Sequence, residues 1–228
     1  MSNLENSLNE SLSLLKSNKY NEALEILKKI EIEDSRVFFL LGTIYSVMKN
    51  INLGEEFLIK ASKLDNKNSS IFNNLANLMV VKGDLESAKK NYLTAIEIDQ
   101  NIDSMSEIAN IYINENNLDD AKRYLNMALE KDPEHKKSNF RLGKLYLKVR
   151  SYPYAKERLN RAIQLNPSNP NYVATYSKVL YELNGVEMAI GYLRDKLNEF
   201  PKSTVLYSMI AQFYYGSGLQ KDYERYKN

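Results

Sequence analysis

Apolar positions recur along the chain with helical spacing, in stretches that are separated by short polar turns. Phe38, Leu41 and Tyr45 form one such stripe, and Leu58 with Ala61 forms another in the following stretch. Side chains three and four positions apart share one face of a helix. Turn sequences such as KGD at 82–84 lie between the stretches. The pattern therefore predicts pairs of helices joined by tight turns.

A pair that consists of a large apolar residue and then a small residue recurs at a regular interval along the chain. These small residues stand at positions 42, 76, 109, 143, 177 and 211, so the intervals are 34, 33, 34, 34 and 34. A second series of small residues lies twelve positions after the first, and prolines at 133, 167 and 201 recur with the same period. A fixed period of 20–50 residues is typical of repeat architectures. The sequence therefore predicts stacked copies of one two-helix unit.

These residues resemble the tetratricopeptide repeat family, whose unit carries an aromatic residue, Leu-Gly, Tyr, Ala, Phe, Ala and Pro in that order. The resemblance covers nearly the whole chain, although no Trp stands in the family's Trp slot, where the fourth full unit has Asn139. It implies an all-α, right-handed superhelical solenoid of antiparallel helix pairs, with about six or seven units. The family's Phe slot holds Leu58, Tyr92, Leu125, Leu159 and Leu193.

The repeat pattern predicts one solenoid over residues 1–228, with no separate second domain. Its parts are an atypical N-terminal unit at 1–34, repeats at 35–68, 69–101, 102–135, 136–169 and 170–203, and an incomplete or capping C-terminal unit at 204–228. The helix expected around 4–17 has no large-small pair, and Tyr223 occupies a small slot near the C-terminus. Terminal units are expected to differ because a solenoid must cover its end faces.

Composition removes several kinds of chemistry. The chain has no Cys, which excludes disulfides and thiol catalysis, and its one histidine, His135, excludes a site that needs two imidazoles. His135 is interpreted as a turn residue between two units. No nucleotide-binding or hydrolase motif is present. We therefore expect no enzyme activity, no metal and no cofactor. No basic start with an apolar run and no membrane-length apolar stretch occurs, so a cytoplasmic protein without membrane insertion is expected.

In families of this type the first helix of each unit lines the concave surface. Its second, fifth, sixth and ninth positions share one face outside the core slots. On this basis the sequence predicts a partner-binding surface made of Asn73, Asn74, Asn77, Asn110, Lys137, Phe140, Arg141, Lys144, Thr175 and Lys178.

The predicted surface has an amide part and a basic part. Carboxamides carry both donors and an acceptor, so the asparagines could bond a peptide backbone whatever its sequence; the alternative is a solvated polar face in an Asn-rich chain.

The basic part agrees with an uneven charge distribution. Residues 1–135 hold 15 basic and 22 acidic side chains, whereas residues 136–228 hold 16 and 7, within a net charge of +2. An acidic partner at the second half is expected, as is self-association that salt weakens.

The sequence favours a non-catalytic scaffold that binds a partner peptide or segment in its concave groove. One alternative is a regulatory or substrate-presenting module of a larger enzyme or of a secretion or pilus assembly complex, which differs only in the partner. A nucleic-acid-binding solenoid is less favoured, and no nucleic-acid partner is expected, because Asp103 and Glu107 make part of the groove acidic.

Overall fold

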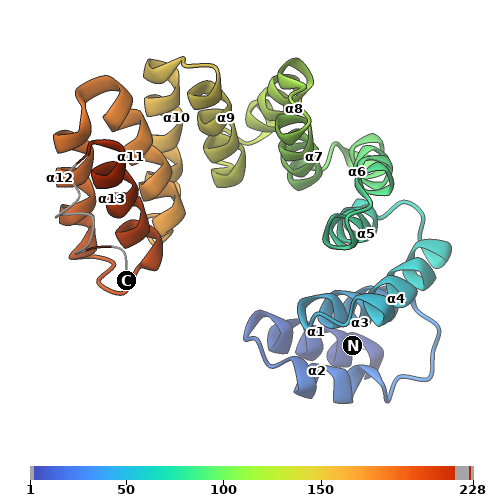
Figure 1. The fold of residues 1–228 in the computed structure, drawn as a ribbon. Helices are drawn as coiled ribbons and strands as arrows, with labels where there is room; N and C mark the ends of the chain where they lie inside the picture. The colour runs from blue at the N-terminus through green and yellow to red at the C-terminus, as the bar shows by residue number, and fades with distance from the viewer. Residues whose placement is uncertain (1–2, 219–225, 227–228) are drawn as a thin grey trace. The chain divides into compact units, whose positions relative to one another are not determined.

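The computed structural model describes residues 3–218 and residue 226, and the described part is built of helices without any strand (Figure 1). The helices are α1 (Asn3–Lys16), α2 (Tyr20–Leu27), α3 (Ser35–Val47), α4 (Ile51–Leu64), α5 (Ser69–Lys82), α6 (Leu85–Asp99), α7 (Ile102–Asn114), α8 (Leu118–Lys131), α9 (Lys136–Lys148), α10 (Tyr152–Leu165), α11 (Pro170–Asn184), α12 (Val186–Leu197) and α13 (Thr204–Gly216). The all-α fold class predicted from the repeat is therefore confirmed.

The odd-numbered helices are the first, or A, helices of the repeats, and the even-numbered ones are the second, or B, helices. Figure 1 shows α3 packed antiparallel against α4 and α9 against α10, and the A helices α1, α5 and α11 likewise contact the B helix that follows them. The contacts divide the chain into two compact units, residues 1–111 and 112–228. The predicted division into repeats within one solenoid stays a prediction. Tyr223 lies outside the described residues.

In the pairs α3–α4 and α9–α10, a large residue of the B helix sits directly on the small residue of the A helix. The five residues of the predicted Phe slot are at most 1 % exposed. A Cβ built on Gly42 of α3 would lie 2.7 Å from Leu58 Cγ and 2.9 Å from the backbone nitrogen of Leu58. A Cβ on Gly143 of α9 would lie 2.6 Å from Cγ of Leu159 in α10. The small residue is therefore what lets the two backbones approach.

Replacing Gly42 by alanine should destabilise the protein, although alanine is the better helix former. The added Cβ would push α3 and α4 apart, and overpacking of this kind costs about 1–3 kcal/mol. Gly191 on α12 is the matched control, because no described atom lies within 4 Å of its ideal Cβ. Gly191→Ala should therefore raise the free energy of unfolding by about 0.5–1 kcal/mol. Urea denaturation followed by circular dichroism measures both, and equal effects would contradict the close-approach explanation.

The first A helix, α1, has the small residue that the sequence pattern did not reveal. Ser11 lies twelve residues before Ala23, which is the spacing between the two small residues in the five repeats from 35 to 203, and both residues are completely buried. The residue before Ser11 is Glu10, which is exposed. This unit therefore has the small residue of the pattern but lacks the large apolar residue before it. The Ser11 hydroxyl has no hydrogen-bond partner among the described residues.

Ser11→Ala should raise the free energy of unfolding by about 1 kcal/mol, because it removes a buried hydroxyl that makes no bond. Ser177 of α11 occupies the same slot and is equally buried, but its Oγ donates to the carbonyl of Ala174 at 2.7 Å. Ser177→Ala breaks that bond and should lower the free energy of unfolding by about 0.5–1.5 kcal/mol. Thermal and urea unfolding of the two variants measure this difference. A larger stabilisation by Ser177→Ala than by Ser11→Ala would contradict it.

Asn139 shows how a polar residue replaces the aromatic of the family pattern. The Asn139 side chain is completely buried, and its Nδ2 donates to the carbonyls of Pro133 at 2.9 Å and His135 at 3.2 Å. Burial of an amide is tolerated because these bonds satisfy its donors. His135 is the residue that precedes α9, and its Nδ1 lies 2.7 Å from Ser138 Oγ. The histidine thus belongs to the turn between two units.

Candidate protein-binding surface

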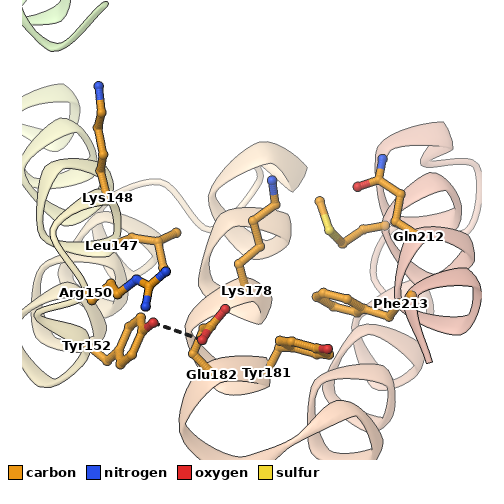
Figure 2. A pocket seen from close by; sticks show the side chains of 11 residues that line it. Leu147, Lys148, Arg150, Tyr152, Lys178, Tyr181, Glu182, Gln212 and Phe213 are labelled. Atoms are coloured by element: carbon orange, nitrogen blue, oxygen red, sulfur yellow. Dashed lines mark hydrogen bonds between the residues drawn. The ribbon is translucent and has the colours of Figure 1, made fainter. Parts of the chain in front are cut away.

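A pocket of about 460 Å³ opens on the second unit where three A helices, α9, α11 and α13, present side chains to one side (Figure 2). Its lining comes from the end of α9, the turn that follows it, the first residue of α10, the second half of α11 and α13. The lining residues are Leu147, Lys148, Arg150, Tyr152, Lys178, Tyr181, Glu182, Met209, Gln212, Phe213 and Gly216. The pocket is therefore a feature of the A-helix face.

Helical periodicity explains why these residues meet. Lys178 is the ninth residue of α11, and Tyr181 and Glu182 follow it by three and four positions. Residues with this spacing lie on one face of a helix, one turn further along. Leu147 and Lys148 hold the matching twelfth and thirteenth positions of α9. The predicted stripe of second, fifth, sixth and ninth positions thus continues for one more turn.

The wall of the pocket is apolar and partly aromatic. The rings of Tyr181 and Phe213 stack with centroids 5.1 Å apart and planes inclined by 7°, so α11 and α13 are joined by an aromatic contact. Figure 2 shows these two rings side by side. Met209 and Phe213 are largely buried and Leu147 is half-buried. Such a wall would lose its contact with water if an apolar group entered the pocket.

The rim of the pocket carries charge. Figure 2 shows Lys148, Lys178 and Gln212 pointing to the same side from three helices. Lys148 Nζ donates to the carbonyl of Ile113 at 2.9 Å. The Tyr152 hydroxyl donates to Glu182 at 2.9 Å, and this bond raises the pKa of Tyr152 above its usual value.

Next to the pocket, the predicted basic residues of α9 and α11 form a cluster around stacked rings. Phe140 stacks on Tyr172 with centroids 4.3 Å apart, and Lys144 Nζ lies 5.8 Å from the Phe140 centroid. Partial loss of hydration lowers the pKa of Lys144, and the positive charges of Arg141 and Lys178 lower it further. The structure thus places three of the four predicted cations close together, and only Lys178 of the four lines the pocket.

Lys137, the fourth predicted cation, lies close enough to Tyr172 to influence its pKa. Burial raises the pKa of Tyr172, and the charges of Arg141 and Lys137 partly oppose that rise. Thr175 of α11 is half-buried, and its Oγ1 donates to the carbonyl of Asn171 at 2.8 Å. The basic cluster and the pocket therefore lie on adjoining parts of the same two helices, α9 and α11.

The predicted asparagine cluster lies in the first unit, where three of its members take part in hydrogen bonds within the fold. Asn74 Nδ2 donates to Thr43 Oγ1 of α3 at 2.9 Å. Asn73 Oδ1 accepts from Ser104 Oγ of α7 at 2.9 Å, and Asn77 Oδ1 accepts from the Tyr92 hydroxyl at 2.6 Å. Asn110 is half-buried on α7. These bonds tie neighbouring helices together and fix the orientation of the carboxamides.

Among the described residues, no helix combines the length and the apolar character needed to cross a membrane. The same residues include no group of three or more histidine, aspartate or glutamate side chains arranged to hold a metal ion.

The fold and this surface define a class of protein: an all-helical repeat protein with a side-chain-lined pocket on its A helices. The tetratricopeptide repeat model matches residues 35–68 and 69–102, and a second model of the same description matches residues 112–179. Together these matches span more than half of the chain. The chain therefore belongs to the tetratricopeptide repeat family, whose members are typically non-catalytic scaffolds that bind other proteins.

Two curated relatives and one solved structure illustrate the similarity. The chain is 26% identical over 154 residues to anaphase-promoting complex subunit CDC16 of Saccharomyces cerevisiae, covering 63% of this chain and 18% of that protein. It is 25% identical to a TPR repeat-containing protein of Methanocaldococcus jannaschii, covering 86% of this chain and 38% of that protein. The chain thus spans well under half the length of either relative. PilF of Pseudomonas aeruginosa superposes with a TM-score of 0.77 at 16% identity, over 91% of this chain and 96% of that one.

Because the charge of Lys178 contributes to the lowered pKa of Lys144, removing that charge should have a measurable effect. Lys178→Gln removes one positive charge near Lys144, so the pKa of Lys144 should rise toward that of free lysine. Only the neutral amine is nucleophilic, so acylation of Lys144 should then require a higher pH. Peptide mass spectrometry after acylation between pH 7 and 11 measures this shift. Lys156→Gln on α10 is the control, and an identical shift in both variants would contradict the charge cluster.

Proposed function

We propose that this chain is a non-catalytic scaffold that holds a segment of a partner protein against its A-helix face. The observation that carries the proposal is the pocket to which α9, α11 and α13 all contribute. A segment lying across three successive A helices would contact all of them at once. The adjoining cluster of Lys137, Phe140, Arg141, Lys144, Thr175 and Lys178 would extend the contact surface along α9 and α11.

The chemistry of the surface suits a polypeptide. Aromatic and aliphatic side chains form the pocket wall, whereas amines and an amide stand at its rim, which is the usual composition of a binding site with an apolar centre and a polar edge. In the first unit, Asn73, Asn74, Asn77 and Asn110 would serve the peptide backbone. A carboxamide held by one intramolecular bond still has a second polar atom to offer. The fixed orientations of three of them would reduce the entropy lost on binding.

A second candidate places the same surface inside a larger assembly, as a regulatory or substrate-presenting module. CDC16, a relative, is named as a subunit of the anaphase-promoting complex. PilW, a type IV pilus biogenesis factor, superposes with a TM-score of 0.79 at 13% identity, over 92% of this chain and 100% of that one. Both candidates use one binding surface and differ in the identity of the partner. A cytoplasmic location stays a prediction.

Reversing two charges on the proposed surface should abolish partner capture without unfolding the protein. Lys144 and Lys178 are exposed, so the double variant Lys144→Glu with Lys178→Glu should keep the helical circular dichroism spectrum. A partner held against this face should lose about tenfold or more in affinity. Affinity capture from the native source, quantified by mass spectrometry, compares the variant with the unchanged protein.

The matched control reverses two exposed lysines on B helices, Lys131→Glu on α8 with Lys156→Glu on α10. At least one protein should be captured by the unchanged chain and by this control, but not by the Lys144 and Lys178 double variant. Capture that falls equally in both double variants would reflect net charge alone and would contradict a site on the A-helix face.

A further inference from the structure

The pocket between α9, α11 and α13 has an apolar wall and a rim that is mainly cationic, and this combination specifies the chemistry of its occupant. We propose that the pocket binds a segment of another protein in which one large apolar side chain is flanked by carboxylates. The proposal rests on the scaffold function proposed above and adds the chemical class of the partner.

The apolar part of the occupant follows from the wall. Tyr181 and Phe213 close one side as a stacked pair, and Met209 and Leu147 contribute aliphatic surface. Gly216, the last residue of α13, contributes no side chain, so the wall is recessed there. A large apolar residue that enters this space would be removed from water, which contributes about 25 cal/mol for each Å² buried.

The carboxylates follow from the rim. Lys148, Arg150 and Lys178 are cations, whereas Glu182 is the one carboxylate among the lining residues and already accepts a hydrogen bond from Tyr152. Lys148 donates one bond to Ile113, and an ammonium has three donors, so it can still bond a ligand. Three cations against one carboxylate leave the rim with a positive excess. Complementary charge steers a partner to the site and selects between partners.

The size of the contact favours a segment over a single side chain. Packed helices lie about 8–10 Å apart, so three neighbouring A helices span about 20 Å. An extended chain advances about 3.3–3.6 Å per residue, which gives about six residues across the groove. The central apolar residue would then reach the pocket while its neighbours on each side pass Lys148 and Lys178.

A second copy of this chain is the main competing occupant, because its loop after α2 has similar chemistry. Ile32 in that loop is 61 % exposed and lies between Glu31 and Glu33. One short loop in a pocket of about 460 Å³ would bury far less than the roughly 1,200 Å² of a stable protein interface. A longer segment from another protein is therefore the occupant that we propose.

The experiment selects binders from a phage-displayed library of random 12-residue peptides and measures them by fluorescence anisotropy. Selected peptides should share a large apolar residue within two positions of at least two carboxylates. Gly216→Leu should fill part of the pocket and weaken these peptides at least tenfold. Gly191→Leu adds the same side chain to α12, where no described atom lies within 4 Å of the ideal Cβ, and should leave binding unchanged.

Opposite substitutions at one exposed rim position test the charge separately. Gln212→Lys should tighten the selected peptides and Gln212→Glu should weaken them, each by about threefold to tenfold, and both effects should shrink as salt is added. Peptides that lack carboxylates, or that bind equally well to Gly216→Leu, would overturn this proposal. If those peptides were nevertheless lost in the Lys144 and Lys178 double variant, the scaffold function would stand.

Two further outcomes also decide the question. Selection that yields no peptide overturns the pocket's role, whereas the scaffold function falls only if affinity capture fails as well. Sedimentation velocity tests whether the chain associates with itself. Self-association that is lost in Gly216→Leu would assign the pocket to a second copy and would overturn the proposal.

Discussion

The rest of the structure depends on the contact between one large residue of a B helix and one small residue of its A helix, which α3 makes with α4 and α9 makes with α10. Leu58 over Gly42 and Leu159 over Gly143 bring the two backbones so close that even a methyl group would collide. This contact fixes the rotation of each helix about its axis. Once the rotation is fixed, the direction in which every other side chain of the A helix points is fixed as well. The proposed binding surface is therefore a consequence of how each A helix is rotated by its packing.

This dependence explains how far the sequence predicts the fold. The small residues that recur at a period of 34 indicated helix pairs, because a small residue lets two packed helices approach closely. The A helices after the first begin at the residues that open the predicted units, from Ser35 to Thr204. The first unit was harder to predict because Ser11 fills a slot elsewhere held mainly by Gly or Ala, and Glu10 precedes it. A serine preceded by a charged residue gives no hydrophobic signal, although it satisfies the same steric requirement.

The candidate site was less accessible to sequence reasoning. Lys178 in the pocket follows from the periodic rule, whereas Tyr181 and Glu182 lie one turn beyond the last position considered. Extending the same rule by three and four residues would have found them. The bonds of Asn73, Asn74 and Asn77 could not be found in this way. They depend on side-chain orientation and on partners about 15 to 31 residues away, which periodicity does not specify.

The charges on α9 and α11 indicate that this face is not optimised for stability alone. Arg141, Lys144 and Lys178 lie close enough for the first and last to lower the pKa of the middle one, so the folded state carries repulsion that an alternating pattern would avoid. In repeat proteins, stability is approximately a sum of local terms, so such a cost is confined to the repeats that bear it. A ligand with carboxylates would remove that repulsion on binding. The local cost in the free protein would thus become part of the proposed preference for an acidic partner.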